Sequence, residues 1–335
     1  MVFRSLTQSL STQRDPMLAL NPLLKSVART FYLSLSHLPA AIQQPLSLAY
    51  LLARLADTIV DVQTVPLELR IMLLSRLRGC VQEPHHEILI TEMSQQIQEA
   101  LPYFSYQNAI LLESTESLLT LLSEQPSAIL TLIQQVLLLI FEGQALDLNY
   151  FDSRSGIVHF KTEQELDRYL YLVAGSVGEF WTKICLACIP NYTIANLDKL
   201  LPKAIAFGKA LQLTNILRDL RQDLQNGRCY LPIAADVFSE ESRDHSQDLV
   251  GQLLVHDPML IYRWTEQAKG YLDDAKTYTD VITNRRIRFS TLVPMQLAHK
   301  TLARLPIKLS KTSVYRTVIA SLLQAYSPLA RVQRR

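Results

Sequence analysis

Two pairs of aspartates are the residues of this chain whose spacing points most directly to chemistry. Asp57 and Asp61 occur in ARLADTIVD, and Asp219 and Asp223 occur in NILRDLRQD. Residues four apart in a helix project from the same face, so each pair brings two repelling carboxylates together. Mg²⁺ prefers oxygen ligands and commonly bridges one or two carboxylates to substrate phosphates. The pairs therefore predict two helices that face each other across a pocket for Mg²⁺ and a diphosphate.

Polar and basic residues precede the first pair on the same helix face. Arg54 lies three residues before Asp57, and Tyr50 lies seven residues before it. A guanidinium fixed beside a metal-binding carboxylate pair can grip the extra negative charge of a diphosphate through two parallel hydrogen bonds. Arg54 and Tyr50 are therefore candidate site residues.

A second polar stripe precedes the other pair. Gln212 and Asn215 lie seven and four residues before Asp219, and they share one helical stripe with both aspartates of the pair. Their amide oxygens can accept from cations and from metal-bound water. Arg218 is expected to point aside from this stripe. Arg228 follows Gly227 at the predicted helix end, which places another cation near the same site.

Composition indicates an all-helical protein that must position these residues without a glycine-rich loop. Of 335 residues, 48% are hydrophobic and only 9 are glycine. Long apolar periodicity with few glycines is typical of an all-α fold. Neither GxGxxG nor GxxxxGK[ST] is present, so metal ions and basic side chains must bind any phosphate.

Proline and capping residues divide the chain into roughly ten predicted helices in one domain. Asn21-Pro22 is expected to start the first helix, and residues 40–61 form the helix of the first aspartate pair. Thr162 and Glu165 form a predicted capping box for a helix that reaches about residue 188. The second pair lies near the end of a helix over 194–224, which Asn226-Gly227 terminates.

Charge and hydropathy favour a cytoplasmic protein that does not bind nucleic acid. The net charge is only +2, and residues 1–19 lack a secretory signal and are expected to be a flexible segment. The apolar run 129–141 is predicted to be too short and too polar to span a bilayer. Cys185 and Cys188 are expected to be core residues rather than a redox or metal pair. Loose peripheral membrane contact stays open.

Four segments, in chain order, resemble the squalene/phytoene synthases. They are ARTFYLSLSHLP at 28–39, YLLARLADTIVD at 50–61, DRYLYLVAGSVG at 167–178 and LQLTNILRDLRQDLQNGRCYLP at 211–232. The resemblance covers about residues 20–325. It implies the class I isoprenoid synthase fold, a single-domain helical bundle around a central cavity over 20–326, with residues 327–335 as a basic tail.

The same resemblance assigns roles to residues of this chain. It implies that Mg²⁺ is held by Asp57, Asp61, Asn215, Asp219 and Asp223. It implies that the substrate diphosphates are bound by Arg29, Phe31, Arg54, Gln212, Asn215, Arg218 and Arg228. Tyr50, Arg54 and Tyr169 are the implied catalytic residues. Leu172 departs from the pattern, because many members carry tyrosine directly before the VAG block.

The implied reaction joins two farnesyl diphosphates head to head through presqualene diphosphate and, with NADPH, gives squalene. Lys308 and Lys311 lie in a segment resembling the NADPH region of squalene synthases and are the expected contacts of the 2′-phosphate. Phytoene or dehydrosqualene synthesis without a reductant is the alternative. A non-catalytic assembly factor of the same fold is a third reading, although such proteins tend to lose the aspartates kept here. Donor length, reduction, product release at a membrane and oligomeric state stay open.

Overall fold

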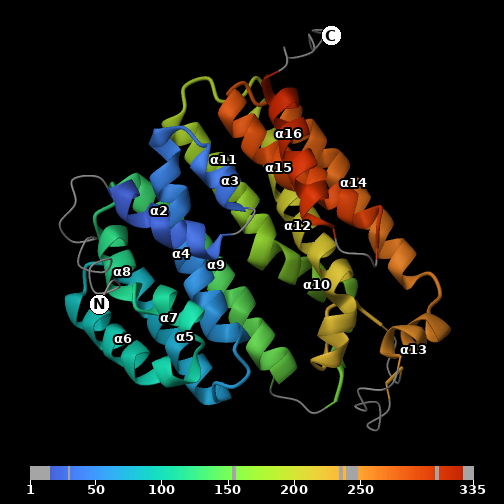
Figure 1. Cartoon of the computed structure of the whole chain (residues 1–335), viewed down its shortest axis with the longest axis horizontal. Helices are drawn as coiled ribbons and strands as arrows, with labels where there is room; N and C mark the ends of the chain where they lie inside the picture. The colour runs from blue at the N-terminus through green and yellow to red at the C-terminus, as the bar shows by residue number, and fades with distance from the viewer. Residues whose placement is uncertain are drawn as a thin grey trace. The chain divides into compact units, whose positions relative to one another are not determined.

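The structure is a computed structural model that describes residues 16–28, 31–152, 156–233, 237–238, 248–305 and 309–326. Most of these residues are helical (Figure 1). The only strands among them are the short β1 (Val158–His159) and β2 (Arg228–Cys229). The all-α prediction is therefore confirmed. Arg29 and Lys308, two of the predicted site residues, lie outside the described residues.

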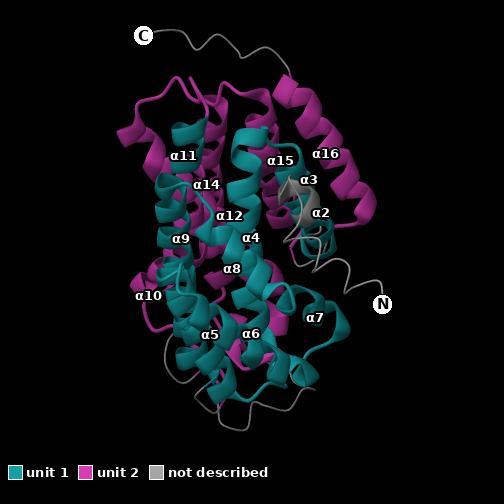
Figure 2. Cartoon of the chain, turned by 90° about the vertical axis from the view of Figure 1, so that its left-hand side faces the viewer, with its two compact units in different colours: residues 1–153, 183–188 teal, residues 154–182, 189–335 magenta. Residues whose placement is uncertain are grey.

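The chain forms two compact units, each described by itself below. The first comprises residues 1–153 and 183–188, and the second comprises 154–182 and 189–335 (Figure 2). The first aspartate pair belongs to the first unit and the second pair to the second. That the two pairs face each other within one domain stays a prediction.

The first unit is built around the helix of the first aspartate pair. Its helices are α2 (Pro16–Val27), α3 (Phe31–Ser36), α4 (Ala40–Asp61), α5 (Leu67–Gln82), α6 (Glu87–Ala100), α7 (Tyr106–Leu112), α8 (Thr115–Ser123) and α9 (Ser127–Asp147). A π-helical turn, Leu148–Asp152, follows α9. α4 packs against α2, α5, α8 and α9, so most of its length is buried. The predicted bounds of α4 are confirmed.

A buried ion pair fixes the end of α4. Arg70 of α5 is 5% exposed, and its Nη1 donates to the carbonyl of Val60 at 2.9 Å and to Oδ2 of Asp152 at 2.5 Å. The carbonyl of Val60 lies in the last turn of α4, where helix carbonyls lack partners and a cation is favourable. This contact anchors the turn that carries Asp61 to the π-helical turn after α9.

The second unit contains the helix of the second aspartate pair. Its helices are α10 (Glu163–Leu170), α11 (Ser176–Cys188, of which 183–188 belong to the first unit), α12 (Leu197–Gln225), α13 (Leu249–His256), α14 (Leu260–Asp280), α15 (Arg285–Leu302) and α16 (Lys311–Tyr326). A π-helical turn, Tyr171–Gly175, joins α10 to α11. α12 packs against α14, α15 and the π-helical turn.

Two glycines allow α12 to pass close to the segment 174–178. A Cβ added to Gly208 would lie 2.0 Å from the carbonyl oxygen of Ala174, and one added to Gly178 would lie 1.9 Å from that of Ala204. Real Cβ atoms do not approach backbone this closely, so only glycine fits at either position. The crossing therefore sets the distance between α12 and the chain that follows Tyr169.

Local signals predicted several boundaries, and packing moved others. The capping box of Thr162 and Glu165 forms as predicted, and Gly227, with φ +79°, ends α12. Among the described residues, the first helix begins at Pro16 rather than at Asn21-Pro22, because proline is tolerated inside the first turns of a helix that starts upstream. The predicted helix over 162–188 is interrupted by the π-helical turn.

The apolar segment of α9 is longer than predicted. Ser127–Asp152 is the one span among the described residues that is long and apolar enough to cross a membrane, judged by length and composition. The prediction that this run is too short was therefore wrong, because the helix continues past residue 141. One such helix is weak support for a span, since core helices of soluble proteins pass the same test.

The cysteines are all free thiols. Cys185 is buried, as predicted, whereas its neighbour Cys188 is half-buried. Burial raises the pKa of Cys80 to about 11 and the pKa of Cys229 to about 12. Both groups therefore remain protonated and unreactive at neutral pH.

The glycine crossing gives a stability test. Gly208→Ala should lower the free energy of unfolding by about 1–3 kcal/mol, because the added methyl must displace backbone. Gly270→Ala on α14 is the matched control: nothing lies within 4 Å of its added Cβ, so a gain of about 0.5–1 kcal/mol is expected. Urea denaturation of both variants measures the difference. Equal stability of the two variants would contradict the close crossing.

Candidate active site

A polar stripe runs along one face of α4. Tyr50, Arg54 and Asp57 are partly exposed and Asp61 is exposed, whereas the residues between them are mostly buried. Because the spacing is four, three and four residues, all four side chains lie on one face of the helix. The predicted shared face is therefore present: the four side chains form an accessible stripe beside the buried residues of α4.

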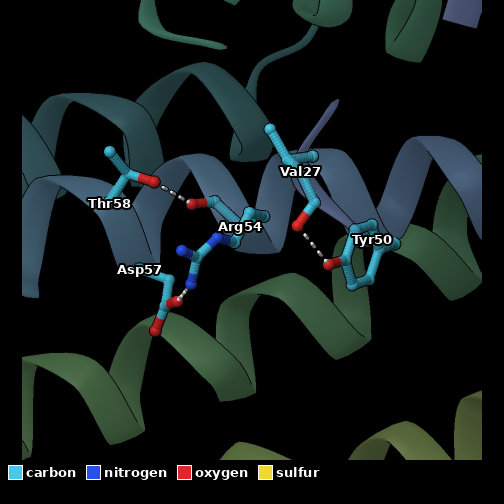
Figure 3. A network of polar contacts seen from close by, with 5 residues as sticks. All are labelled: Val27, Tyr50, Arg54, Asp57 and Thr58. Carbon is cyan, nitrogen blue, oxygen red and sulfur yellow. Dashed lines mark hydrogen bonds and ion pairs between the residues drawn. The ribbon is translucent and has the colours of Figure 1, made fainter. Parts of the chain in front are cut away.

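Hydrogen bonds order this stripe from within the first unit (Figure 3). Nη1 of Arg54 donates to Oδ2 of Asp57 in an ion pair three residues apart. The hydroxyl of Thr58, which is buried, donates to the carbonyl of Arg54 at 2.8 Å. Arg54 is therefore held over the aspartate before any ligand arrives.

An aromatic pair lies at the other end of the stripe. The ring centroids of Phe31 and Tyr50 are 5.3 Å apart. The hydroxyl of Tyr50 donates to the carbonyl of Val27 at 3.4 Å (Figure 3). Phe31 begins α3 and brings an aromatic ring to the aspartate helix. Its predicted place at the diphosphate site stays a prediction.

Without a bound cation, burial disfavours the ionised form of Asp57. Burial raises the pKa of Asp57 above its ordinary value, and the opposing attraction and hydrogen bond of Arg54 do not cancel that effect. The side chain still keeps 39% of its surface accessible. A carboxylate that is desolvated yet reachable is a site where a divalent cation gains most.

α12 carries a matching stripe in the second unit. Gln212, Asn215, Asp219 and Asp223 are partly exposed, whereas Leu213, Ile216, Leu217, Leu220 and Leu224 between them are buried. The predicted face is therefore present on this helix too, with two carboxylates and two amides along it.

Arg218 lies nearer to the stripe than predicted. Its Nε donates to Oδ1 of Asp219 at 3.0 Å and to Oδ2 at 3.1 Å, and its Nη2 also donates to Oδ2. The prediction that Arg218 points aside was wrong, because a long side chain bends back to the carboxylate of the next residue. Each stripe thus has one arginine in contact with its first aspartate.

Arg228 is fixed by the parallel pairing of β1 and β2. Val158 pairs with Arg228 and His159 with Cys229, and the amide of Val158 donates to the carbonyl of Gly227 at 2.9 Å. Arg228 is only 8% exposed, so it is not an ordinary surface arginine. The carboxylate of Asp223 contributes to the raised pKa of Cys229, which places β2 beside the end of the α12 stripe.

An aromatic cluster adjoins the two strands. The ring of Tyr169 stacks on Tyr230 at 5.1 Å and lies 5.6 Å from Phe160. All three rings are buried. Tyr169 was predicted as a site residue, whereas Phe160 and Tyr230 were missed, because nothing in the sequence signalled that two-residue strands would pair.

The hydroxyl of Tyr171 donates to Glu179 at 3.0 Å, and burial together with that carboxylate raises the pKa of Tyr171.

The donor set of each stripe suits Mg²⁺ shared with a substrate. Among the described residues, no group of three or more His, Cys, Asp or Glu side chains is close enough to hold a metal ion. Mg²⁺ does not need such a cage, because it keeps several waters and takes one or two carboxylates plus phosphate oxygens. The aspartate pairs, with Asn215 as an additional oxygen donor, fit that mode of binding.

Of the two lysines predicted for NADPH, the structure describes one. Lys311 is the exposed first residue of α16, and Lys308 lies outside the described residues. Arg29, predicted at the diphosphate site, is also outside them.

Comparison with known proteins assigns the family. The family model for squalene/phytoene synthase matches residues 24–314, so this chain belongs to the squalene/phytoene synthase family. Members of this family are prenyltransferases.

Relatives of several specificities match the chain. A presqualene diphosphate synthase of Zymomonas mobilis is 34% identical over 32% of this chain and 33% of its own length. Human squalene synthase is 23% identical over 84% of this chain and 61% of its own length. The 15-cis-phytoene synthase of Synechocystis is 36% identical over 41% of this chain and 37% of its own length. The matches thus span less than two thirds of these relatives.

Solved structures share the fold. A ligand complex of the squalene synthase TcSQS superposes with a TM-score of 0.66 at 19% identity, covering 91% of this chain and 86% of the other. A dehydrosqualene synthase in complex with a ligand gives 0.56 at 18% identity, covering 97% and 99%. The predicted isoprenoid synthase helical fold is therefore confirmed.

Asp57→Asn should stabilise the metal-free protein. Because the pKa of Asp57 is raised on folding, its ionisation favours the unfolded chain, and stability is lost as pH rises from about the unfolded value of 3.8 through the folded pKa. The advantage of the variant should therefore be absent in acid and should grow as the pH rises. Denaturation across pH without divalent cations measures it.

Asp198→Asn is the control with the opposite sign. Asp198 lies in the first turn of α12, where a negative charge favours the helix dipole. Its removal should cost about 0.3–1 kcal/mol. A destabilised Asp57→Asn protein at neutral pH would show that Arg54 outweighs burial.

Proposed function

We propose that this chain is a Mg²⁺-dependent head-to-head prenyltransferase that joins two farnesyl diphosphates through presqualene diphosphate and, with NADPH, yields squalene. One observation carries the proposal. Two helices each carry an accessible polar stripe beside buried apolar residues, with a carboxylate pair and an arginine in contact with its first aspartate. Membership of the squalene/phytoene synthase family supports the same reaction class.

The stripes suit the binding and departure of diphosphate. Bound Mg²⁺ supplies charge neutralisation that grows as the bond to the leaving diphosphate breaks. Asp57 and Asp61 would hold it on α4, and Asp219, Asp223 and Asn215 would hold it on α12. Arg54 and Arg218 lie beside those carboxylates, so some of their guanidinium N–H groups can donate hydrogen bonds to phosphate oxygens of the substrate.

Arg228 and the aromatic cluster suit the later step. Arg228 is buried and held by strand pairing, so it presents a positive charge at a fixed place near Asp223. The allyl cation left after ionisation must meet an alkene instead of water. The stacked rings of Tyr169 and Tyr230 offer negative π faces that can stabilise such a cation. Tyr50, beside Phe31, is proposed to act where the first donor ionises.

A second candidate function is phytoene or dehydrosqualene synthesis without a reductant. Relatives named phytoene synthase and a structural neighbour named dehydrosqualene synthase favour it. NADPH use rests on Lys308 and Lys311 alone. A non-catalytic assembly role is disfavoured, because all four aspartates are kept.

The metal role is tested by neutralising one carboxylate in each pair. Asp57→Asn and Asp219→Asn should each lower turnover of farnesyl diphosphate by about 100-fold or more, because charge stabilisation of the leaving group is lost. Asp198→Asn, on α12 but off the stripe, should keep turnover. Circular dichroism checks the fold of each variant. Near-normal turnover at saturating Mg²⁺ would remove the aspartates from the mechanism.

The product is tested by supplying farnesyl or geranylgeranyl diphosphate with Mg²⁺, with and without NADPH, and identifying products by mass. Farnesyl diphosphate alone should give mainly presqualene diphosphate or unreduced products, and NADPH should convert the output to squalene. Lys308→Ala should weaken the reductive step but not the first condensation, whereas Lys269→Ala on α14 should change neither. A hydrocarbon product that is the same with and without NADPH would place the chain with the phytoene or dehydrosqualene synthases.

A further inference from the structure

The charge of this chain is divided very unevenly along its length. Residues 281–335 contain 11 of the 33 Lys and Arg residues and none of the 31 Asp and Glu residues. This segment therefore carries a formal charge of +11, and residues 1–280 carry −9. The net charge of +2 conceals this asymmetry, which is typical of proteins with an anionic macromolecular or membrane partner.

Within this segment, α16 exposes its large apolar side chains. Tyr315, Ile319, Leu322, Leu323 and Tyr326 are 66%, 59%, 39%, 69% and 43% exposed. They follow one another at intervals of four, three, one and three residues, so they form one continuous face of the helix. We call these five residues the outer face of α16.

The opposite side of α16 is small and polar, yet it is the buried side. Thr317, Ser321 and Ala325 are fully buried. Lys300 of α15 donates to the hydroxyl of Thr317 at 2.7 Å, and Ser321 donates to Gln296 at 2.9 Å. α16 lies along α15 in both views (Figures 1 and 2). The usual pattern of a surface helix is thus inverted, because packing on α15 uses the polar side and leaves the apolar side outward.

Basic side chains border the outer face. Lys311 and Arg316 are exposed and lie at its two edges on the helix surface. The guanidinium of Arg285 lies 6.0 Å from the ring centroid of Tyr326, at the far end of the face. Long basic side chains beside an apolar helix face can reach lipid headgroups while the apolar residues enter the acyl boundary.

We propose that the outer face of α16 docks on a membrane surface that contains anionic lipid, with the helix lying in the plane of the interface. A bilayer satisfies both features of this face, since it accepts apolar side chains and attracts the surrounding positive charge. A second copy of the chain fits poorly, because pairing two outer faces would bring Lys311 and Arg316 of both copies together. A nucleic acid would leave Ile319 and Leu323 in water.

Co-sedimentation of the full chain with phosphatidylcholine vesicles, with and without phosphatidylglycerol, tests this docking. Binding should require phosphatidylglycerol and weaken as salt rises. The double variant Ile319→Ser/Leu323→Ser should bind about tenfold or more weakly. Arg316→Gln should bind roughly fivefold more weakly, as expected for one basic residue near an anionic surface.

Matched controls distinguish binding through this face from nonspecific hydrophobic or electrostatic adsorption to the vesicles. Ile88→Ser removes another exposed apolar residue, and Arg76→Gln removes another exposed arginine; both should bind like the unaltered chain. All the substituted positions are exposed, so folding should persist, and circular dichroism checks it. No binding to phosphatidylglycerol vesicles, or equal binding by the double variant, overturns the proposal. A dimer in light scattering that the double variant dissociates would assign the face to a second copy and also overturn it.

Discussion

Repulsion between two carboxylates on one helix face is the constraint on which both candidate site helices depend. On each helix the carboxylates lie beside buried apolar residues, and burial raises the pKa of Asp57. Arg54 and Arg218 relieve the repulsion in part by pairing with the first aspartate of each stripe. For Asp57, burial still outweighs the arginine, so the stripe remains prepared for a further cation. The buried carboxylate of Asp57 thus lowers the stability of the metal-free fold, and a bound cation can restore it.

Backbone packing in the second unit places the groups that surround the second stripe. Glycine at 178 and 208 lets α12 approach the segment after Tyr169 more closely than any side chain would permit. The pairing of β1 with β2 then holds Arg228 at the end of the same helix and brings Phe160 and Tyr230 to Tyr169. A very short ladder in an otherwise helical unit therefore fixes a cation and three rings at once.

In α16 too, tertiary packing and not the local sequence pattern decides which side of the helix is buried. Its apolar residues would form the buried side of an ordinary surface helix, but α15 offers hydrogen-bond partners to Thr317 and Ser321. The polar side therefore packs inward, and the apolar side becomes an outer surface. This surface lies in the strongly basic last part of the chain, away from the carboxylate stripes in sequence.

The sequence by itself determined the helical class, the bounds of α4, the capping box at Thr162 and the common face of each aspartate pair. These features follow from i,i+4 geometry, proline positions and local capping, which need no distant contact. Only the tertiary structure decided that Arg218 bends onto Asp219, that Arg228 is buried, and that Phe160 and Tyr230 join Tyr169. It also decided which side of α16 faces outward. The physical reason is that these outcomes depend on pairing and packing between segments far apart in the chain. Local propensity carries no information about such contacts.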